Sequence, residues 1–114
     1  MPGGPTRSVY LRNVIRPWLL LLLRGSPAHG YDLSRRLAEH GLKADASAVY
    51  RALRLLENQG HVRSAWTTSP DGPARRVYRL TPKGRRLLLA TAEEMANARA
   101  AFDAFLADYD TCDK

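Results

Sequence analysis

The sequence predicts a mainly α-helical fold that contains one small β-hairpin and ends in a long helix. Two short helical segments between residues 30 and 60 are each followed by a glycine, Gly41 and Gly60. After Gly60 the apolar pattern changes from a helical period to a period of two residues, and after Pro82 it returns to a helical period. The chain has 114 residues, which is the length of a single domain.

The N-terminal part combines a Gly/Pro-rich start with an apolar run. Residues 1–6 are expected to be disordered, and residues 8–15 can form a helix. We expect a break or kink near Arg16, because Pro17 removes a backbone donor from a helix interior but fits the first turn of a new helix. The run WLLLLL, residues 18–23, is then a buried core helix, since a membrane span needs about 20 apolar residues. No membrane partner is predicted.

The next two helices form a predicted helix-turn-helix within residues 7–81. The first runs from about residue 30 to residue 40 and ends at Gly41. The second, over about 46–59, can be capped by the Asp45 carboxylate and closed by Gly60 in a left-handed conformation. Two short helices joined by a tight turn are typical of DNA-binding proteins.

The helix over 46–59 has two different faces. Val49, Leu53 and Leu56 recur at helical spacing and are expected to point inward. The opposite face carries hydroxyls, an aromatic ring and two guanidinium groups but no acid, in the order Ser47, Tyr50, Arg51, Arg54. Arginines on such a face can reach guanine edges or phosphates in the major groove, so we predict DNA contacts here. The plainer alternative is a solvated helix face with two arginines.

Residues 61–80 read as two strands joined by a turn. The strand 61–68 has Val62 and Trp66 available to a buried face, and residues 69–73, SPDGP, are a strong turn signal. The second strand has two sides, one with Arg76, Tyr78 and Leu80 and the other with Arg75, Val77 and Arg79.

A hairpin placed directly after a helix-turn-helix forms a wing. Its tip can enter a neighbouring minor groove, where arginine is favoured, so Arg75 and Arg76 are predicted DNA contacts. The alternative is a solvated hairpin whose arginines keep an edge strand soluble.

A long C-terminal helix is predicted over residues 82–109, with Thr81 as its cap and Pro82 at its first position. Its 28 residues would span about 42 Å, more than the small body in front of it can cover. Apolar residues at alternating steps of four and three form a heptad row that is interrupted by Arg99: Leu88, Ala92, Met95, Phe102, Leu106 and Tyr109. We predict that this row forms a homodimer interface. The alternative is that the helix folds back on its own domain, and residues 110–114 are read as a tail.

Charge and cysteine content point in the same direction. The net charge is +7, divided into +11 for residues 1–89 and −4 for residues 90–114. A basic body with an acidic end favours a localised surface for an acidic partner such as nucleic acid. The single cysteine, Cys112, excludes an internal disulfide and fits a reducing cytoplasm.

A metal or redox sensor and an enzyme are the two other functional classes to compare with DNA regulation. A metal or redox sensor would use His29, His40, His61, Asp110 and Cys112, but no pair of these has a recognisable metal-ligand spacing. An enzyme would need a phosphate-binding glycine loop, a nucleophile elbow or paired acids, and none is found. We therefore predict no catalytic activity, no metal and no cofactor. A non-specific architectural DNA binder remains open, since basic charge alone supports it.

Three motifs carry a resemblance to the PadR-type transcriptional regulators, and the match covers about residues 19–88. They are HGYDL at 29–33, AVYRALRLLE at 48–57 and GPARRVYRLTPKG at 72–84. The resemblance implies a winged helix-turn-helix with a C-terminal dimerisation helix. The length is similar to that of the small subfamily, which has one such helix. The implied partners are a double-stranded DNA operator and a second copy of the chain.

The chain departs from the family pattern where bases would be read. Arg51 stands where the family often has proline, and residues 45–48, DASA, replace Ser-Pro-Gly-Ser. Family members often release DNA when a small hydrophobic or aromatic compound binds near the dimer interface, which implies a repressor of this kind. The candidate ligand residues are Tyr10, Val14, Trp18, Met95, Phe102 and Phe105. The plainer alternative for these side chains is interface core.

Overall fold

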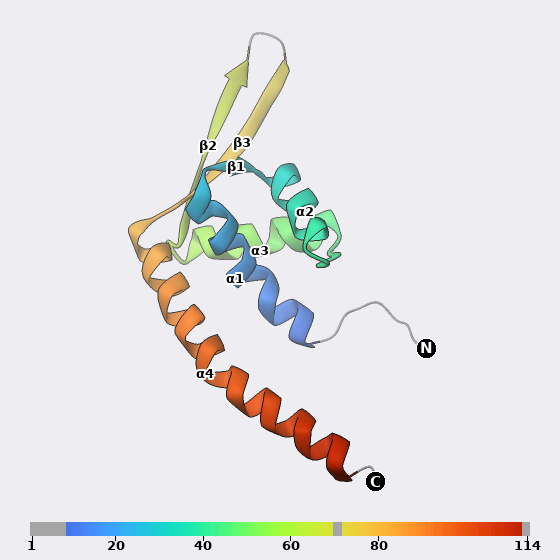
Figure 1. Cartoon of the computed structure of the whole chain (residues 1–114). Coiled ribbons are helices and arrows are strands. Elements are labelled where there is room, and N and C mark those ends of the chain that lie inside the picture. The colour runs from blue at the N-terminus through green and yellow to red at the C-terminus, as the bar shows by residue number, and fades with distance from the viewer. Residues whose placement is uncertain (1–8, 70–71, 113–114) are drawn as a thin grey trace.

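A computed structural model describes residues 9–69 and 72–112 of the chain, with side chains for residues 14–68 and 72–111. The elements in order are α1 (Val9–Gly25), β1 (Ala28–His29), α2 (Gly30–Glu39), α3 (Ala46–Asn58), β2 (Val62–Ser69), β3 (Gly72–Leu80) and α4 (Pro82–Cys112). The first three helices and the base of the sheet form a small body, from which the hairpin and α4 project (Figure 1). The molecule therefore extends over 65 × 34 × 21 Å. The predicted disordered segment, residues 1–6, lies outside the described residues.

Helix α1 has no break near Arg16, where the sequence predicts a break or a kink. The helix runs without interruption from Val9 to Gly25 and contains Pro17 in its interior. Ile15 and Leu19, one on each side of the proline, are both buried in the same core. Packing on both sides of Pro17 therefore compensates for the one backbone hydrogen bond that the proline removes.

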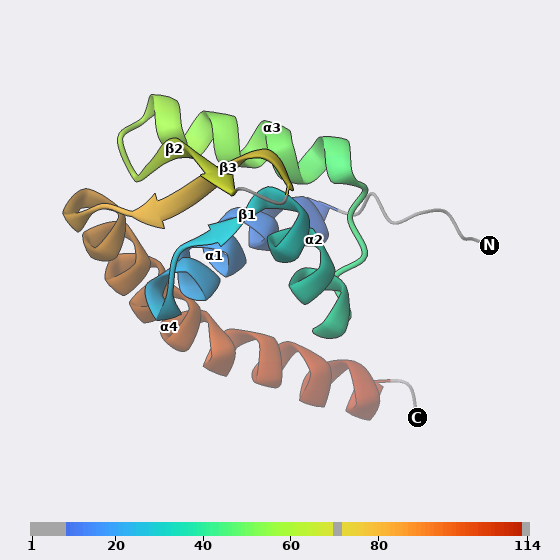
Figure 2. The ribbon, with the colours of Figure 1, turned by 90° about the horizontal axis from the view of Figure 1, so that it is seen from above.

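The core lies where α1, α2 and α3 meet beneath the sheet. Its most deeply buried side chains come from all three helices: Leu19, Leu20, Leu33, Leu37, Val49, Leu53 and Leu56. Seen from above, α1 lies between α3 and α4 and contacts both (Figure 2). The predicted central position of the apolar run is confirmed.

The two helices of the helix-turn-helix begin and end close to their predicted bounds. Helix α3 begins after Asp45, whose Oδ1 accepts a hydrogen bond of 2.8 Å from the Ala48 N–H. Gly41 and Gly60 follow α2 and α3 with φ angles of +82° and +84°. A side chain would be strained in that conformation, which explains why a glycine stands at each position.

The sheet has three strands in the order β1-β3-β2, all antiparallel. The strand β1 was not predicted, because two residues are too few to show a period. Val62 and Tyr78 face the core and are buried, but Trp66 is 63% exposed, so its predicted burial is wrong. Trp66 lies on the same side of the hairpin as Val62, four residues further along, where the strand has passed beyond the body.

Helix α4 begins as predicted and continues to Cys112, slightly beyond the expected end near Tyr109. The Thr81 hydroxyl accepts a hydrogen bond of 2.9 Å from the Gly84 N–H, which is the predicted cap of the first turn. The first residues of the expected tail, from Asp110 onward, are therefore helical.

The start of α4 is tied directly to the end of α3. The Thr81 hydroxyl donates to the Gly60 carbonyl at 2.7 Å, and the Lys83 ammonium donates to the Gln59 carbonyl at 2.8 Å. These carbonyls lie at the end of a helix, where backbone acceptors lack partners and positive charge is favoured. We call residues 59–61 and 81–84 the α3–α4 joint.

Candidate nucleic-acid interface

The outward face of α3 has the residues that the sequence predicted. Ser47, Tyr50, Arg51 and Arg54 are all exposed, whereas Val49, Leu53 and Leu56 on the opposite face are at most 1% exposed. Helical spacing therefore separated the two faces correctly, and α3 presents two guanidinium groups to solvent.

Tyr50 also has a structural contact that its spacing did not reveal. A Cβ atom added to Gly30, the first residue of α2, would collide with the Tyr50 ring, with Cζ at 2.8 Å and the hydroxyl at 3.0 Å. The glycine thus allows the ring to lie against the start of α2. Tyr50 therefore extends from the outward face of α3 to the first residue of α2.

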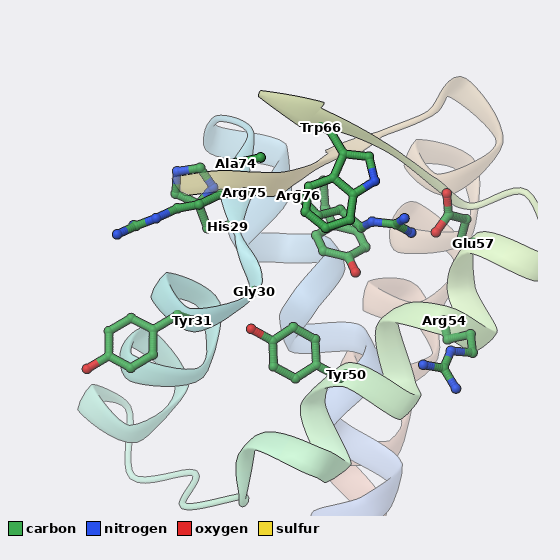
Figure 3. Close-up of a pocket in the computed structure, with 11 residues that line it drawn as sticks. His29, Gly30, Tyr31, Tyr50, Arg54, Glu57, Trp66, Ala74, Arg75 and Arg76 are labelled. Atoms are coloured by element: carbon green, nitrogen blue, oxygen red, sulfur yellow. The ribbon is translucent and has the colours of Figure 1, made fainter. Parts of the chain in front are cut away.

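A groove of about 600 Å³ lies between α3, the start of α2 and the hairpin (Figure 3). Its walls carry four aromatic rings, three arginines and one glutamate, and its lining comprises His29, Gly30, Tyr31, Tyr50, Arg54, Glu57, Trp66, Ala74, Arg75, Arg76 and Tyr78. We call this the α3–wing groove. The structure thus places Tyr50, Arg54, Arg75 and Arg76 around one concavity, while Ser47 and Arg51 lie on α3 outside the lining.

The strand register places the two predicted wing arginines on opposite faces of the hairpin. Arg76 pairs with Trp66, and Arg75 pairs with Thr67. Because successive side chains of a strand point to opposite faces, Arg76 and Trp66 share one face while Arg75 shares the other with Arg79. A hairpin with a guanidinium on each face can contact phosphates on both sides of its tip.

Arg76 contacts two neighbours, Trp66 and Ser64, that the sequence did not connect with it. Its guanidinium carbon lies 4.9 Å from the centre of the Trp66 ring, a cation–π geometry. Its Nη1 donates to the Ser64 hydroxyl at 3.4 Å. The same hydroxyl donates to the Glu57 carboxylate at 2.7 Å, and this carboxylate also accepts from the Ser64 N–H at 3.2 Å. The chain Glu57–Ser64–Arg76 thus connects α3 to the hairpin.

The groove is electropositive, and its deepest phenol is neutral at physiological pH. The lining contains three arginines and one carboxylate, and Ser64 donates a hydrogen bond to this carboxylate. Burial raises the pKa of Tyr78, and this outweighs the opposing effect of the Arg76 charge. Such a surface is suited to an anion that is broader than a single phosphate.

Sequence reasoning missed Trp66, Glu57 and Tyr31 as groove residues. Tyr31 is 68% exposed and lies beside Gly30 at the start of α2. Only the register, which places Trp66 opposite Arg76, could have indicated a role for the tryptophan.

The predicted dimer row is exposed along α4. Leu88 is half-buried against the body, and the rest of the row is exposed: Ala92, Met95, Phe102, Leu106 and Tyr109. The body of the chain does not cover this row. The structure therefore does not show the alternative in which α4 folds back on its own domain. A row of large apolar side chains in water is typical of an interaction surface.

The candidate ligand residues are not gathered into one site within the chain. Trp18 stacks on His40, with ring centres 4.5 Å apart, while Met95, Phe102 and Phe105 are exposed on α4. Val14 is half-buried, and the side chain of Tyr10 lies outside the described residues. The ligand site stays a prediction.

The possible metal ligands are dispersed. His29 lies at the groove, His40 stacks on Trp18, and His61 belongs to the α3–α4 joint. Over residues 14–68 and 72–111, no three His, Cys, Asp or Glu side chains are grouped so as to hold a metal ion. Among the helices in the described part of the chain, none is long and apolar enough to cross a membrane.

Comparisons with known proteins agree with this fold. Transcriptional regulator Rv3488 of Mycobacterium tuberculosis is 35% identical over 79 residues, which are 69% of this chain and 73% of that protein. Naringenin 7-O-methyltransferase of Oryza sativa subsp. japonica is 40% identical over 83 residues, or 70% of this chain, but the chain spans only 22% of that enzyme. The shared segment is thus a small part of the larger protein.

Two solved structures share the fold over most of this chain. A PadR family transcriptional regulator from Eggerthella lenta is 31% identical, with a TM-score of 0.77 and 85% of each chain covered. Bacillus subtilis PadR, in a complex with operator DNA, is 26% identical, with a TM-score of 0.64 over 69% of this chain and 46% of that one.

The model of the transcriptional regulator PadR-like family matches residues 19–90, well over half of the chain. This confirms the resemblance drawn from the motifs and agrees with the prediction that the chain is not an enzyme. The chain belongs to the transcriptional regulator PadR-like family.

Proposed function

We propose that this family member is a sequence-specific DNA-binding regulator that places α3 in the major groove and the hairpin beside it. The α3–wing groove carries the proposal, because it brings the exposed arginines of a helix and of a hairpin to one electropositive surface. The proposed DNA contacts are Ser47, Tyr50, Arg51, Arg54, Arg75 and Arg76. Bacillus subtilis PadR, which has the same fold, was solved with operator DNA, and this supports a DNA partner for the present chain.

The proposed active form is a homodimer joined through α4. The exposed row from Ala92 to Tyr109 supports this proposal, because a second copy would cover it. A two-fold dimer would present its recognition helices to half-sites about 34 Å apart, so the preferred operator is expected to be roughly palindromic.

Repression with release by a ligand is the finer part of the proposal. In a dimer, the aromatic side chains of α4 and those of α1 from either copy would surround a space between the two bodies. The proposed effector is a small hydrophobic or aromatic compound, held by Val14, Trp18, Met95, Phe102 and Phe105, together with Tyr10. Its binding would change the angle between the two copies and hence the spacing of the recognition helices.

The experiment is a salt-titrated binding curve on DNA from the region upstream of the protein's own gene, beside a scrambled duplex of equal length. A preference of about 10³ or more, near 4 kcal/mol, is expected for a site-specific regulator. Equal affinity for both duplexes would contradict sequence specificity and favour the architectural alternative.

Three variants, one of them a matched control, separate the roles of α3 and α4. Arg54→Ala should weaken specific binding and leave the dimer intact, whereas Arg86→Ala, which removes the same charge from an exposed position on α4, should leave specific binding near the wild-type level. Phe102→Asp should disrupt the dimer, as measured by analytical ultracentrifugation. An unchanged dimer would remove the α4 row from the proposal.

A further inference from the structure

We infer that the α3–wing groove holds the sugar–phosphate backbone of one DNA strand, with Trp66 as a direct contact and with Glu57 and Ser64 as positioning residues for Arg76. The inference rests on the proposed DNA-binding function and adds to it three residues that the predicted contact set does not include. It follows from four observations on the α3–wing groove.

The first observation is the exposure of Trp66. An indole that is 63% exposed keeps most of its apolar surface in water, although its neighbours Val62 and Tyr78 on the same face are buried. The ring lines the α3–wing groove, as Figure 3 shows, and is not turned to the outer face of the hairpin. Indole offers an apolar face for a deoxyribose and one N–H donor for a phosphate oxygen.

The second observation is that Arg76 is oriented before any ligand arrives. The Trp66 ring lies 4.9 Å from the guanidinium carbon, and the Ser64 hydroxyl accepts from Nη1. A guanidinium has five donors in a rigid fork, and the bond to Ser64 uses one of them. Fixing a long side chain in advance reduces the entropy lost when it binds a phosphate.

The third observation is a carboxylate in a groove that otherwise suits an anion. Glu57 would repel a phosphate, so a carboxylate in this position indicates another role. It accepts two hydrogen bonds from Ser64, at 3.2 and 2.7 Å, and this fixes the hydroxyl so that its lone pair is directed to Arg76. Glu57 therefore acts through Ser64.

The fourth observation is the position of the groove. Its other wall is the outward face of α3, with Tyr50 and Arg54, and its lining also includes Gly30 and Tyr31 at the start of α2. If α3 enters the major groove of DNA, the strand that borders that groove must pass between α3 and the hairpin. The occupant is thus the backbone and not the base edges, and its contacts carry no sequence information.

The test uses a duplex of arbitrary sequence, about 20 base pairs long, because backbone contacts do not require the operator, and its affinity is measured over a series of salt concentrations from about 50 to 200 mM. Trp66→Ala is expected to weaken binding about five-fold with an unchanged salt slope, since indole carries no charge. Arg76→Ala is expected to reduce the slope of log affinity against log salt by about one, the value for one phosphate contact.

Glu57→Ala changes DNA affinity in opposite directions under two explanations of the carboxylate, repulsion of DNA and positioning of Arg76. If the carboxylate only repels DNA, its removal strengthens binding; if it positions Arg76 through Ser64, its removal weakens binding about three-fold or more despite the lost negative charge. Glu57→Gln keeps an acceptor for Ser64 and should restore binding to the wild-type level or above. Unfolding temperatures measured for each variant identify any that merely fail to fold.

Fluorescence reports the contact directly, because the chain has two tryptophans, Trp18 and Trp66. In Trp18→Phe, addition of duplex should quench or shift the remaining Trp66 emission. In Trp66→Phe, the emission of Trp18, which stacks on His40, should not change.

Failure of the inference is distinguishable from failure of the proposed function. If the wild-type protein binds no duplex even at low salt, the proposed DNA-binding function is wrong. A different result overturns the groove assignment and leaves that function intact. In it the wild-type protein binds duplex, Trp66→Ala binds with equal affinity, and the Trp66 emission does not change when duplex is added. Tighter binding by Glu57→Ala overturns the positioning role alone.

Discussion

A methyl group added at Gly84 tests how α4 is joined to the body. Gly84 is in the first turn of α4 and is buried, and a Cβ atom there would collide with the carbonyl oxygen of His61 and lie 2.7 Å from Cδ1 of Leu80. Leu80 is a flexible side chain and can move. The carbonyl belongs to the backbone and accepts a hydrogen bond of 3.2 Å from the Thr81 N–H, so it is held in place.

The magnitude follows from two opposed effects. Helix propensity alone predicts that Gly84→Ala stabilises the protein by about 1 kcal/mol. The collision instead forces α4 away from the α3–α4 joint, at a cost of about 1–3 kcal/mol for overpacking, with about 1 kcal/mol for each joint hydrogen bond that is lost. We expect a net loss of about 2 kcal/mol in the free energy of unfolding, or about 8 °C in the unfolding temperature of a domain of this size.

The assay is thermal unfolding followed by circular dichroism at one fixed protein concentration, because dimerisation would make the midpoint depend on concentration. Gly25→Ala is the matched control. Gly25 is also the glycine of a helix, its φ is not positive, and nothing lies within 4 Å of an added Cβ atom. That variant should be as stable as the wild type or slightly more stable.

The outcome that refutes the reasoning is a Gly84→Ala protein whose unfolding temperature equals or exceeds that of the wild type. Such a result would mean that α4 moves without cost and that the close approach to His61 does not hold the joint together. Equal destabilisation by Gly25→Ala would show that the effect arises from the substitution and not from the collision.

Three further predictions concern other parts of the body. Gly30→Ala should displace the Tyr50 ring and weaken DNA binding by about ten-fold, with a stability change within about 1 kcal/mol, because the obstructing group is a side chain; unchanged affinity would mean that Tyr50 has no role in binding. Burial, and then the charge of Lys83, lowers the pKa of His61, so the folded state favours neutral histidine. The stability that neutral His61 contributes is complete above pH 6.5 and is lost as the pH falls through the lowered pKa. In His61→Gln the urea midpoint should therefore vary less between pH 7 and pH 5 than in the wild type. A variant with the same pH profile as the wild type would exclude His61 as the source of the pH dependence. Asp45→Ala should lower stability by about 1 kcal/mol through loss of the α3 cap, seen in urea unfolding, while Asp45→Asn, which keeps an acceptor, should not.

The helix-turn-helix could be predicted from sequence because each of its signals is local. Asp45 and Gly60 are chemically specialised for the two ends of a helix, and the inward row Val49, Leu53 and Leu56 requires only the helical period. Thr81 and the following proline marked the start of α4 for the same reason. These elements therefore agreed with the structure to within a few residues.

Other features depend on contacts between distant residues and leave no local signal. The two residues of β1 are a strand only because β3, nearly fifty positions later, lies beside them. Pro17 should end a helix by local rules, but burial on both of its sides overrides that preference. Trp66 alternates correctly for a core position and is exposed because the hairpin extends past the body. The α3–wing groove could not be predicted, because its lining comes from five elements whose relative placement only the fold determines.

The α3–α4 joint has a consequence for how operators can vary. Because the carbonyls of Gln59 and Gly60 accept hydrogen bonds from Lys83 and Thr81, α3 is coupled to the start of α4, and the two helices would act as one lever in a dimer. The 31 residues of α4 give that lever a length of about 46 Å. A tilt of about 5° at the dimer contact would then displace the far end by about 4 Å, more than the rise of one base pair, 3.4 Å. In a dimer joined through α4, the stiffness of this joint thus limits how far the half-site spacing can vary. A protein with a stiff joint should reject operators lengthened by a single base pair. A variant with a loosened joint should tolerate them.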